Sequence, residues 1–161
     1  MSRARRSLIG LVAGAVCAAT VLVTAAPAEA ALPPLVVLPQ LQGNPNPGTD
    51  LFASLLPTLT GGTVRENCAI SPRGIMVRCV EHVVTMPSAS PGASGTTFAH
   101  WIFCKNVCVG SLLTHEMVHV AQFEQYGDLF GPMYLLEAGL HGTSCENKWE
   151  KPAYQTGGTC L

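Results

Sequence analysis

The stretch SLLTHEMVHVAQFEQY, residues 111–126, is the segment of this 161-residue chain that decides its fold. It contains no Gly or Pro, and Gly127 follows it as a stop signal, so we predict a helix over 111–126. Apolar side chains nearly encircle this helix, which indicates a buried helix rather than a surface one. One polar stripe runs along a single face at helical spacing, formed by His115, His119, Gln122 and Tyr126. Because burying polar groups without partners is costly, this stripe requires something to bind.

A metal ion is the partner that the spacing favours. His115 and His119 stand one helical turn apart, close enough for both imidazoles to bind one ion. Glu116 lies about 100° around the helix, beside such an ion, where it can accept a proton from an activated water. Zinc lowers the pKa of that water towards about 7 and polarises a carbonyl. The pattern therefore predicts His115 and His119 as zinc ligands and Glu116 as the catalytic general base.

A catalytic zinc site needs a third protein ligand and leaves the fourth position for water. The downstream candidates are Glu137, His141, Glu146 and Glu150. Glu146 and Glu150 each fit a capping box as well, within 143–146 and 147–150, and such a box would give the glutamate a structural role. Spacing alone does not choose between these two glutamates.

Three segments resemble a group of small bacterial proteins related to the zincin-like metallopeptidases of gluzincin type. Those proteins carry H-E-x-x-H-V-x-Q, then G-x-L-F-x-P-x-Y-L, then N-x-aromatic-E-x-x-A. This chain has HEMVHVAQ at 115–122, GDLFGPMYL at 127–135 and NKWEKPAY at 147–154. The resemblance implies that Glu150 is the third zinc ligand and that the activity is that of a peptidase. Pro152 departs from the pattern and predicts a short or kinked third helix.

The remaining segments predict a small α+β domain. Strand-type composition marks the first three of the following segments and helix-type composition the last two: 63–70, 74–85, 96–104, 132–138 and 147–154. The first two strands flank a turn and predict a hairpin. We expect a small β-sheet packed on the buried HExxH helix with two shorter helices, the whole stabilised by disulfides. Trp101 and Phe103 are expected to pack against the buried helix.

The first thirty residues have the features of an export signal. A basic start with three arginines precedes an apolar stretch, and Ala28-Glu29-Ala30 offers a cleavage site. An uncleaved anchor stays open as the alternative, because the apolar run is almost long enough to span a bilayer. We expect a signal peptide at 1–30, a Pro-rich arm or linker at 31–62 with one short helix near 51–56, and the zincin-like metal-binding domain at 63–161.

Six cysteines follow the expected cleavage site. An even number in an exported chain predicts disulfides, and a domain of this size needs such covalent support. Proximity in the sequence favours the pairs Cys68–Cys79, Cys104–Cys108 and Cys145–Cys160.

Six basic and nine acidic residues follow Ala30, which gives a formal net charge of −3. This charge excludes the basic surface with which proteins bind nucleic acids or anionic membranes. We expect a secreted zinc-dependent peptidase that acts on a peptide or protein outside the cytoplasm, without stable membrane association after signal cleavage. One alternative is a secreted zinc-binding module without activity, since little chain remains to build specificity pockets. Another is a metal-free structural protein braced by disulfides.

Gln122 either orients His119 or bonds to a loop. We assign no functional role to His100 or to the tyrosines.

Overall fold

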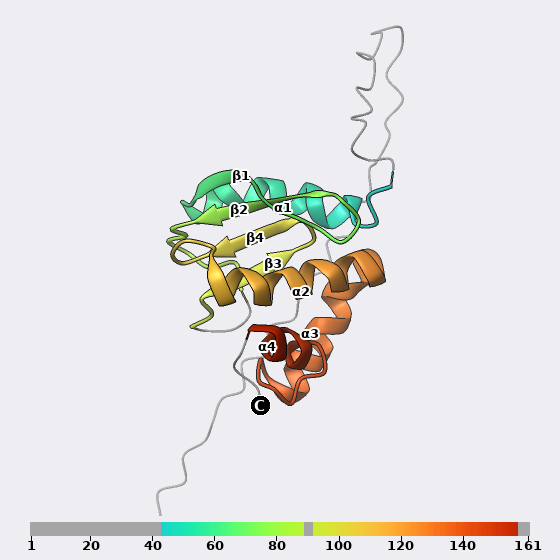
Figure 1. Ribbon diagram of the computed structural model, residues 1–161. Helices are drawn as coiled ribbons and strands as arrows, with labels where there is room; N and C mark the ends of the chain where they lie inside the picture. Colours follow the sequence, from blue (N-terminus) through green and yellow to red (C-terminus); the bar gives the residue numbers. More distant parts are fainter. Residues whose placement is uncertain (1–42, 89–91, 158–161) are drawn as a thin grey trace, which may run out of the picture. The chain divides into compact units, whose positions relative to one another are not determined.

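The computed structural model describes residues 43–88 and 92–157, so the expected signal peptide lies outside the described residues. The described chain has an α+β fold with one four-stranded sheet, four α-helices and a short 3-10 turn (Figure 1). Among these helices there is none whose length and apolar character would allow it to cross a membrane.

The sheet has the strand order β1-β2-β4-β3. Its strands are β1 (Thr63–Ile70), β2 (Met76–Glu81), β3 (Gly95–Phe98) and β4 (Trp101–Cys104). β1 and β2 form the predicted antiparallel hairpin, β2 pairs with β4 in parallel, and β3 pairs with β4 in antiparallel fashion. The described part of the sheet therefore has β3 as one of its edges, next to the helices that carry the candidate site.

The expected single strand at 96–104 is wrong, because the chain reverses within it. Ala99 and His100 form the turn between β3 and β4, and Ala99 takes the left-handed backbone conformation with φ of 50°. The turn is supported from elsewhere in the fold, since the backbone N–H of His100 donates to Asp50 Oδ1 at 2.9 Å. No Gly, Asn or Pro marks this reversal in the sequence, so the usual turn signals were missing.

Helix α1 (Pro47–Thr60) covers one face of the sheet. Its Ala53 and Leu56 are buried in a cluster with β-strand residues that include Phe103. The short helix expected near 51–56 is present as part of the longer α1, whereas an extended arm over the rest of 47–60 is wrong, and the boundary expected at residue 63 lies inside the folded unit. Pro47 does not oppose the helix because it stands in the first turn, where backbone N–H groups have no helical partner.

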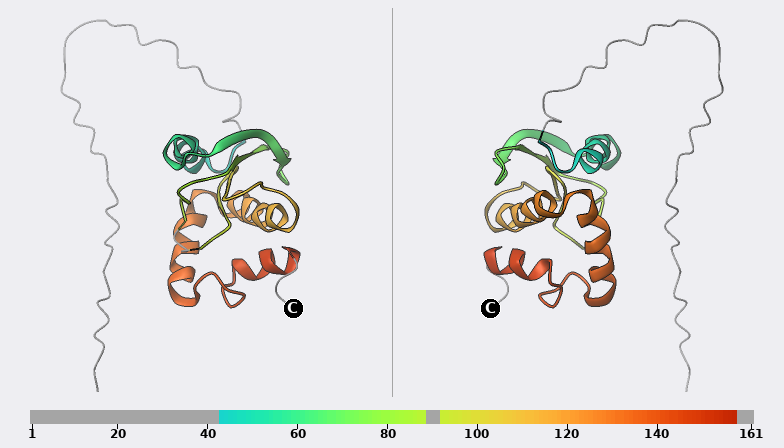
Figure 2. Two further views of the ribbon diagram at one scale, coloured as in Figure 1. Left: turned by 90° about the vertical axis from the view of Figure 1, so that its left-hand side faces the viewer. Right: turned by 90° about the vertical axis from the view of Figure 1, so that its right-hand side faces the viewer.

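Helix α2 (Gly110–Tyr126), close to the helix expected at 111–126, packs on the opposite face of the sheet. Val120 lies in a cluster with Val77 and Ile102, so β4 alternates its side chains between the two helices. Trp101 and Phe103 consequently pack on the face that α1 covers, and the expectation that they contact the buried helix is wrong. Two further views show α2 lying between the sheet and the C-terminal helices (Figure 2).

The C-terminal part consists of the 3-10 turn η2 (Gly127–Leu129) and the helices α3 (Phe130–His141) and α4 (Glu150–Gly157). Both helices are present as expected, but α4 begins at Glu150 rather than near residue 147. Pro152 therefore stands in the first turn of α4, where its missing N–H removes no helical hydrogen bond. This start also places Glu150 at the first residue of α4, within reach of His115 and His119 on α2.

Two of the three predicted disulfides are confirmed. Cys68–Cys79 joins β1 to β2, and Cys104–Cys108 closes the segment between β4 and α2. Cys145 is also disulfide-bonded, whereas its predicted partner Cys160 lies outside the described residues. Such bonds are typical of proteins that fold in an oxidising compartment.

Candidate functional site

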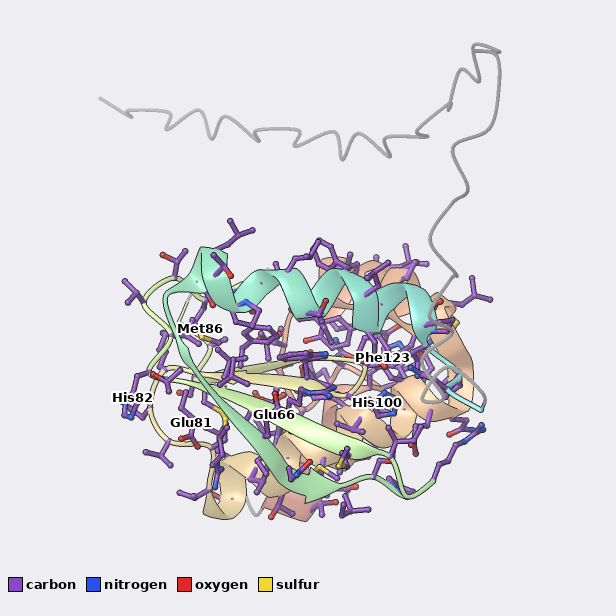
Figure 3. The ribbon with its side chains drawn as sticks, turned by 90° about the horizontal axis from the view of Figure 1, so that it is seen from above. Glu66, Glu81, His82, Met86, His100 and Phe123 are labelled. Carbon is purple, nitrogen blue, oxygen red and sulfur yellow. A yellow bond between two sulfur atoms is a disulfide. The ribbon has the colours of Figure 1, made fainter. Side chains whose placement is uncertain are left out.

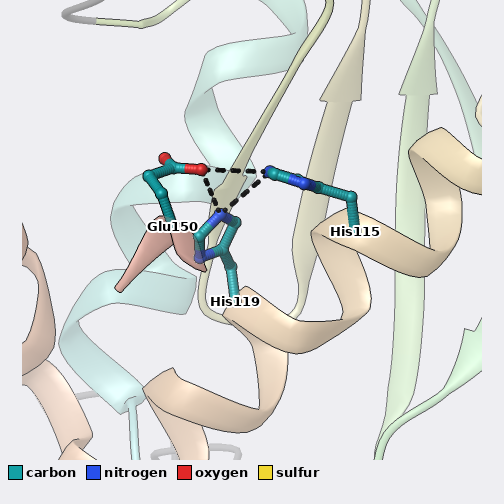
Figure 4. A group of neighbouring side chains, drawn as sticks. All are labelled: His115, His119 and Glu150. Atoms are coloured by element: carbon teal, nitrogen blue, oxygen red, sulfur yellow. Dashed lines mark hydrogen bonds and ion pairs between the residues drawn. The ribbon is translucent and has the colours of Figure 1, made fainter. Parts of the chain in front are cut away.

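Three side chains from α2 and α4 converge on one point (Figure 4). His115 Nε2 and His119 Nε2 are 3.3 Å apart, and Glu150 Oε2 lies 3.2 Å from the first and 3.5 Å from the second. Within residues 43–88 and 92–157, this is the one group of three or more His, Cys, Asp or Glu side chains that is arranged to hold a metal ion. The structure thus brings together the three residues that the sequence and the resemblance named.

The position of Glu150 is fixed on one of its two oxygens. Tyr134 in α3 donates its hydroxyl to Glu150 Oε1 at 2.5 Å. The other oxygen, Oε2, is buried and makes no hydrogen bond, although it points at the two imidazoles. Glu150 therefore presents one free carboxylate oxygen to the point where the histidines meet.

The charges around this point keep Glu150 ionised. Burial alone would raise the pKa of its carboxyl, but His115, His119 and the Tyr134 hydroxyl hold that pKa well below its usual range. Burial by itself would lower the pKa of His119, yet Glu150 and Glu116 raise it. The protein groups alone therefore form an anionic acceptor facing two imidazoles, an environment that favours a positive charge.

Glu116 lies beside this cluster in a buried position, with 3 % of its surface exposed. Thr97 in β3 donates its hydroxyl to Glu116 Oε2 at 2.8 Å. The other oxygen, Oε1, lies against Gly95, where an added Cβ would be only 2.5 Å away, so this close approach depends on a glycine. Burial raises the pKa of the Glu116 carboxyl, although His119 and Thr97 act in the opposite direction.

A cleft of about 1310 Å³ runs past these residues. All four residues of β3 line it, so the cleft follows an edge of the described sheet. Its lining also holds the three converging side chains, Glu116 and several aromatic rings, among them Phe52, Phe98, Phe130, Tyr134 and Tyr154. The site is therefore a cleft with apolar walls and a polar cluster in it, which is the usual character of a ligand-binding site.

The other candidates for the third ligand lie outside the cluster. Glu137 pairs with Lys148 at 3.4 Å and with His141 at 3.8 Å, and Glu146 is exposed. The capping-box role considered for Glu150 is wrong, because its carboxylate contacts Tyr134 and the two histidines rather than the backbone of Asn147. Asn147 instead orders the loop that precedes α4, since its side-chain oxygen accepts a hydrogen bond from the Trp149 N–H at 2.9 Å.

Sequence reasoning missed a second buried histidine cluster. His100 is 1 % exposed; its Nδ1 lies 2.6 Å from Asp50 Oδ2, and its Nε2 lies 3.4 Å from Glu124 Oε1. Ser71 donates its hydroxyl to the same Glu124 oxygen. Burial would lower the pKa of His100, but Asp50 and Glu124 together raise it. Figure 3 shows His100 beneath α1, away from the exposed His82. No sequence signal links these residues, because they come from separate elements.

Gln122 makes both of the contacts that the sequence left as alternatives. Its Oε1 lies 2.8 Å from His119 Nδ1, and its Nε2 donates to the backbone oxygen of Trp149 at 2.9 Å. It is therefore in contact with one candidate ligand and with the residue that precedes another.

Comparisons with models of protein families, with curated proteins and with solved structures found no match to this chain. What the site can do therefore follows from its own side chains.

Proposed function

We propose that the protein is an exported zinc-dependent hydrolase that cleaves peptide bonds. His115, His119 and Glu150 are its zinc ligands, and Glu116 is its general base. The observation that carries this proposal is the triangle of donor atoms at the junction of α2 and α4.

The size of the triangle supports a tetrahedral ion. Bonds of about 2.0–2.1 Å in tetrahedral geometry hold ligand atoms about 3.3–3.4 Å apart. The three separations here are 3.2, 3.3 and 3.5 Å. Two imidazole nitrogens with one carboxylate oxygen suit zinc, whereas calcium and magnesium prefer oxygen ligands alone. A cation at the shared point would also bind the buried Oε2 of Glu150, which has ion-pair contacts with the two imidazoles but no hydrogen bond.

Residues of the chain itself can accept the proton of the attacking water and donate it to the leaving amine. A bound zinc ion would supply Lewis-acid activation of a water molecule and of the substrate carbonyl. Thr97 holds Oε2 of Glu116, which leaves Oε1 of Glu116 free to take a proton from the attacking water. The raised pKa of Glu116 lets it keep that proton until it passes to the leaving amine.

The cleft supports a peptide as the substrate. β3 lines the cleft along its whole length, and an extended peptide can add to such an edge strand through main-chain hydrogen bonds. The cleft is also large for a domain of this size, since ligand pockets usually measure about 300–1,000 Å³. This volume and the placement of Glu116 favour a hydrolase over a zinc-binding module without activity. The signal-type sequence at 1–30 and the disulfides support an exported location.

The substitution Glu116→Gln tests the proposal. Wild type and variant are purified, their zinc content is measured by mass spectrometry, and cleavage of a mixed peptide library is followed by product sequencing. We expect both proteins to hold about one zinc ion per chain and the variant to turn over about 10²–10⁴-fold more slowly. Glu137→Gln, which changes a carboxylate outside the cluster, is the matched control and should behave as wild type.

The two competing functions give different results in the same experiment. A wild-type protein that holds zinc but cleaves no peptide in the library is the binding module. A folded wild-type protein that takes up no zinc contradicts the metal site itself.

A further inference from the structure

We infer that Gln122 is a positioning residue, which fixes the tautomer of His119 and ties that ligand to the backbone just before Glu150; the inference rests on the proposed zinc site. Gln122 is 8 % exposed and lies on α2, three residues after His119. Among the residues that the structure describes, it is the one side chain that hydrogen-bonds both to a candidate ligand and to the neighbour of another.

The orientation of the Gln122 amide follows from its two partners. The backbone oxygen of Trp149 can only accept a hydrogen bond, so the NH₂ group of Gln122 must face it. The amide oxygen is then the atom 2.8 Å from His119 Nδ1. Since that oxygen can only accept, His119 Nδ1 must be the nitrogen that carries the hydrogen.

This tautomer is the one that a metal site needs. With the hydrogen on Nδ1, the neutral ring keeps its lone pair on Nε2. Nε2 is the atom that faces His115 Nε2 at 3.3 Å and Glu150 Oε2 at 3.5 Å. Gln122 therefore prepares His119 to bind a cation through the nitrogen that points at the shared centre.

The second bond extends this effect to the ligand on the other helix. Trp149 directly precedes Glu150, the first residue of α4, so its backbone oxygen marks where α4 starts. The hydrogen bond from Gln122 Nε2 thereby holds that start against α2. The Gln122 amide thus fixes the tautomer and orientation of the His119 ring and limits the movement of Glu150.

Two variants and one control separate this role from a simple helix–loop tie. Gln122→Met keeps the length of the side chain but removes both hydrogen bonds. Gln122→Glu can still accept from His119 Nδ1 but does not donate to Trp149. Gln125→Met is the matched control, because Gln125 is an exposed glutamine on the same helix.

Two measurements are made on each full-length mature protein. The first is the tautomer of His119, read from the ¹⁵N chemical shifts of its imidazole in metal-free protein at a pH at which the ring is neutral, since a protonated ring carries hydrogen on both nitrogens. The second is the zinc dissociation constant, obtained by competition with a chromophoric chelator. We expect wild type, Gln125→Met and Gln122→Glu to carry the hydrogen on Nδ1. We expect Gln122→Met to populate both tautomers and to bind zinc about 10–100-fold more weakly, with a smaller loss for Gln122→Glu.

The inference is overturned if Gln122→Met keeps the hydrogen on Nδ1 and binds zinc as tightly as wild type. Should Gln122→Met fail to fold, a hydrogen on Nε2 of His119 in Gln122→Glu would overturn it equally. The tautomer is read without zinc, so failure of this inference is distinguishable from failure of the proposed function, which shows as absent zinc binding or absent cleavage in wild type.

Discussion

Two clusters of histidine and carboxylate each include a residue of α2, and they are built in opposite ways. In the first, the ligand cluster, His115, His119 and Glu150 aim their free atoms at one shared point. In the second, the closed cluster, His100 has a carboxylate at each ring nitrogen, Asp50 at 2.6 Å and Glu124 at 3.4 Å. The side chains of the ligand cluster converge on one point, whereas in the closed cluster each ring nitrogen of the histidine faces its own carboxylate.

The comparison shows how each cluster compensates the unfavourable free energy of burying charged groups. The closed cluster places a histidine with a raised pKa between two carboxylates, and Ser71 and Asn44 complete the hydrogen bonding of those carboxylates. Its charges are therefore compensated by the protein itself. The ligand cluster leaves Oε2 of Glu150 without a hydrogen bond. A cation is the partner that would complete it, which is why we assign metal binding to one cluster and structural support to the other.

The largest expected effect comes from neutralising one carboxylate in each cluster. Glu150→Gln keeps the shape of the side chain but removes the anionic ligand, so zinc content should fall from about one ion per chain to near zero. Asp50→Asn should keep zinc but lower the free energy of unfolding by about 3 kcal/mol, because it breaks a buried ion pair. Zinc content by mass spectrometry and urea unfolding of both variants measure the two effects. Loss of zinc in Asp50→Asn with retention in Glu150→Gln would reverse our assignment of the clusters.

The pH dependence of stability should come partly from His100, whose pKa is raised in the folded protein by Asp50 on α1 and Glu124 on α2. The folded protein then binds this proton more tightly than the unfolded chain does, so the stabilisation is complete below the unfolded pKa of about 6.5. It is lost as the pH rises through the higher folded pKa. Urea unfolding of wild type and His100→Gln from pH 5 to pH 9 should show a stability difference that shrinks with rising pH. A difference that stays constant would mean that folding does not change the pKa of His100, and one that grows with rising pH would mean that folding lowers it.

The smallest effect is expected from removing the hydroxyl group of Tyr134. Tyr134→Phe removes the hydrogen bond to Glu150 Oε1 and should weaken zinc binding about tenfold, because Glu150 loses the contact that orients it. Tyr154→Phe is the control: its hydroxyl donates to the backbone oxygen of Thr143, so the zinc dissociation constant should be unchanged. Equal zinc affinity in both variants would show that Glu150 needs no support from Tyr134.

The sequence predicted those parts of the structure in which the deciding residues are close along the chain. Apolar periodicity and the absence of Gly and Pro placed the helix at 111–126 within one residue of α2. Alternation around a turn predicted the β1–β2 hairpin, and proximity predicted Cys68–Cys79 and Cys104–Cys108. Each of these features depends on interactions between near neighbours, which a pattern can record.

The elements that were missed, or predicted only in part as α1 was at 51–56, depend on distant contacts. α1 contains prolines and shows no clear period, yet burial of Ala53 and Leu56 against the sheet stabilises it. The turn between β3 and β4 lacks turn residues and is held by Asp50. Because only part of α1 was predicted and its packing on the sheet was not, Trp101 and Phe103 were assigned to the wrong helix.

For the candidate site, the sequence by itself determined that His115 and His119 share one face of a helix, because four residues make about one turn. It also determined that Glu116 lies beside them. Spacing left Glu146 and Glu150 open and only the resemblance implied Glu150; the tertiary structure decided that Glu150, rather than Glu146 or Glu137, meets these histidines. The physical reason is that a helix fixes the geometry of residues one turn apart, whereas the meeting of α2 and α4 depends on packing and on hydrogen bonds between segments far apart in the chain.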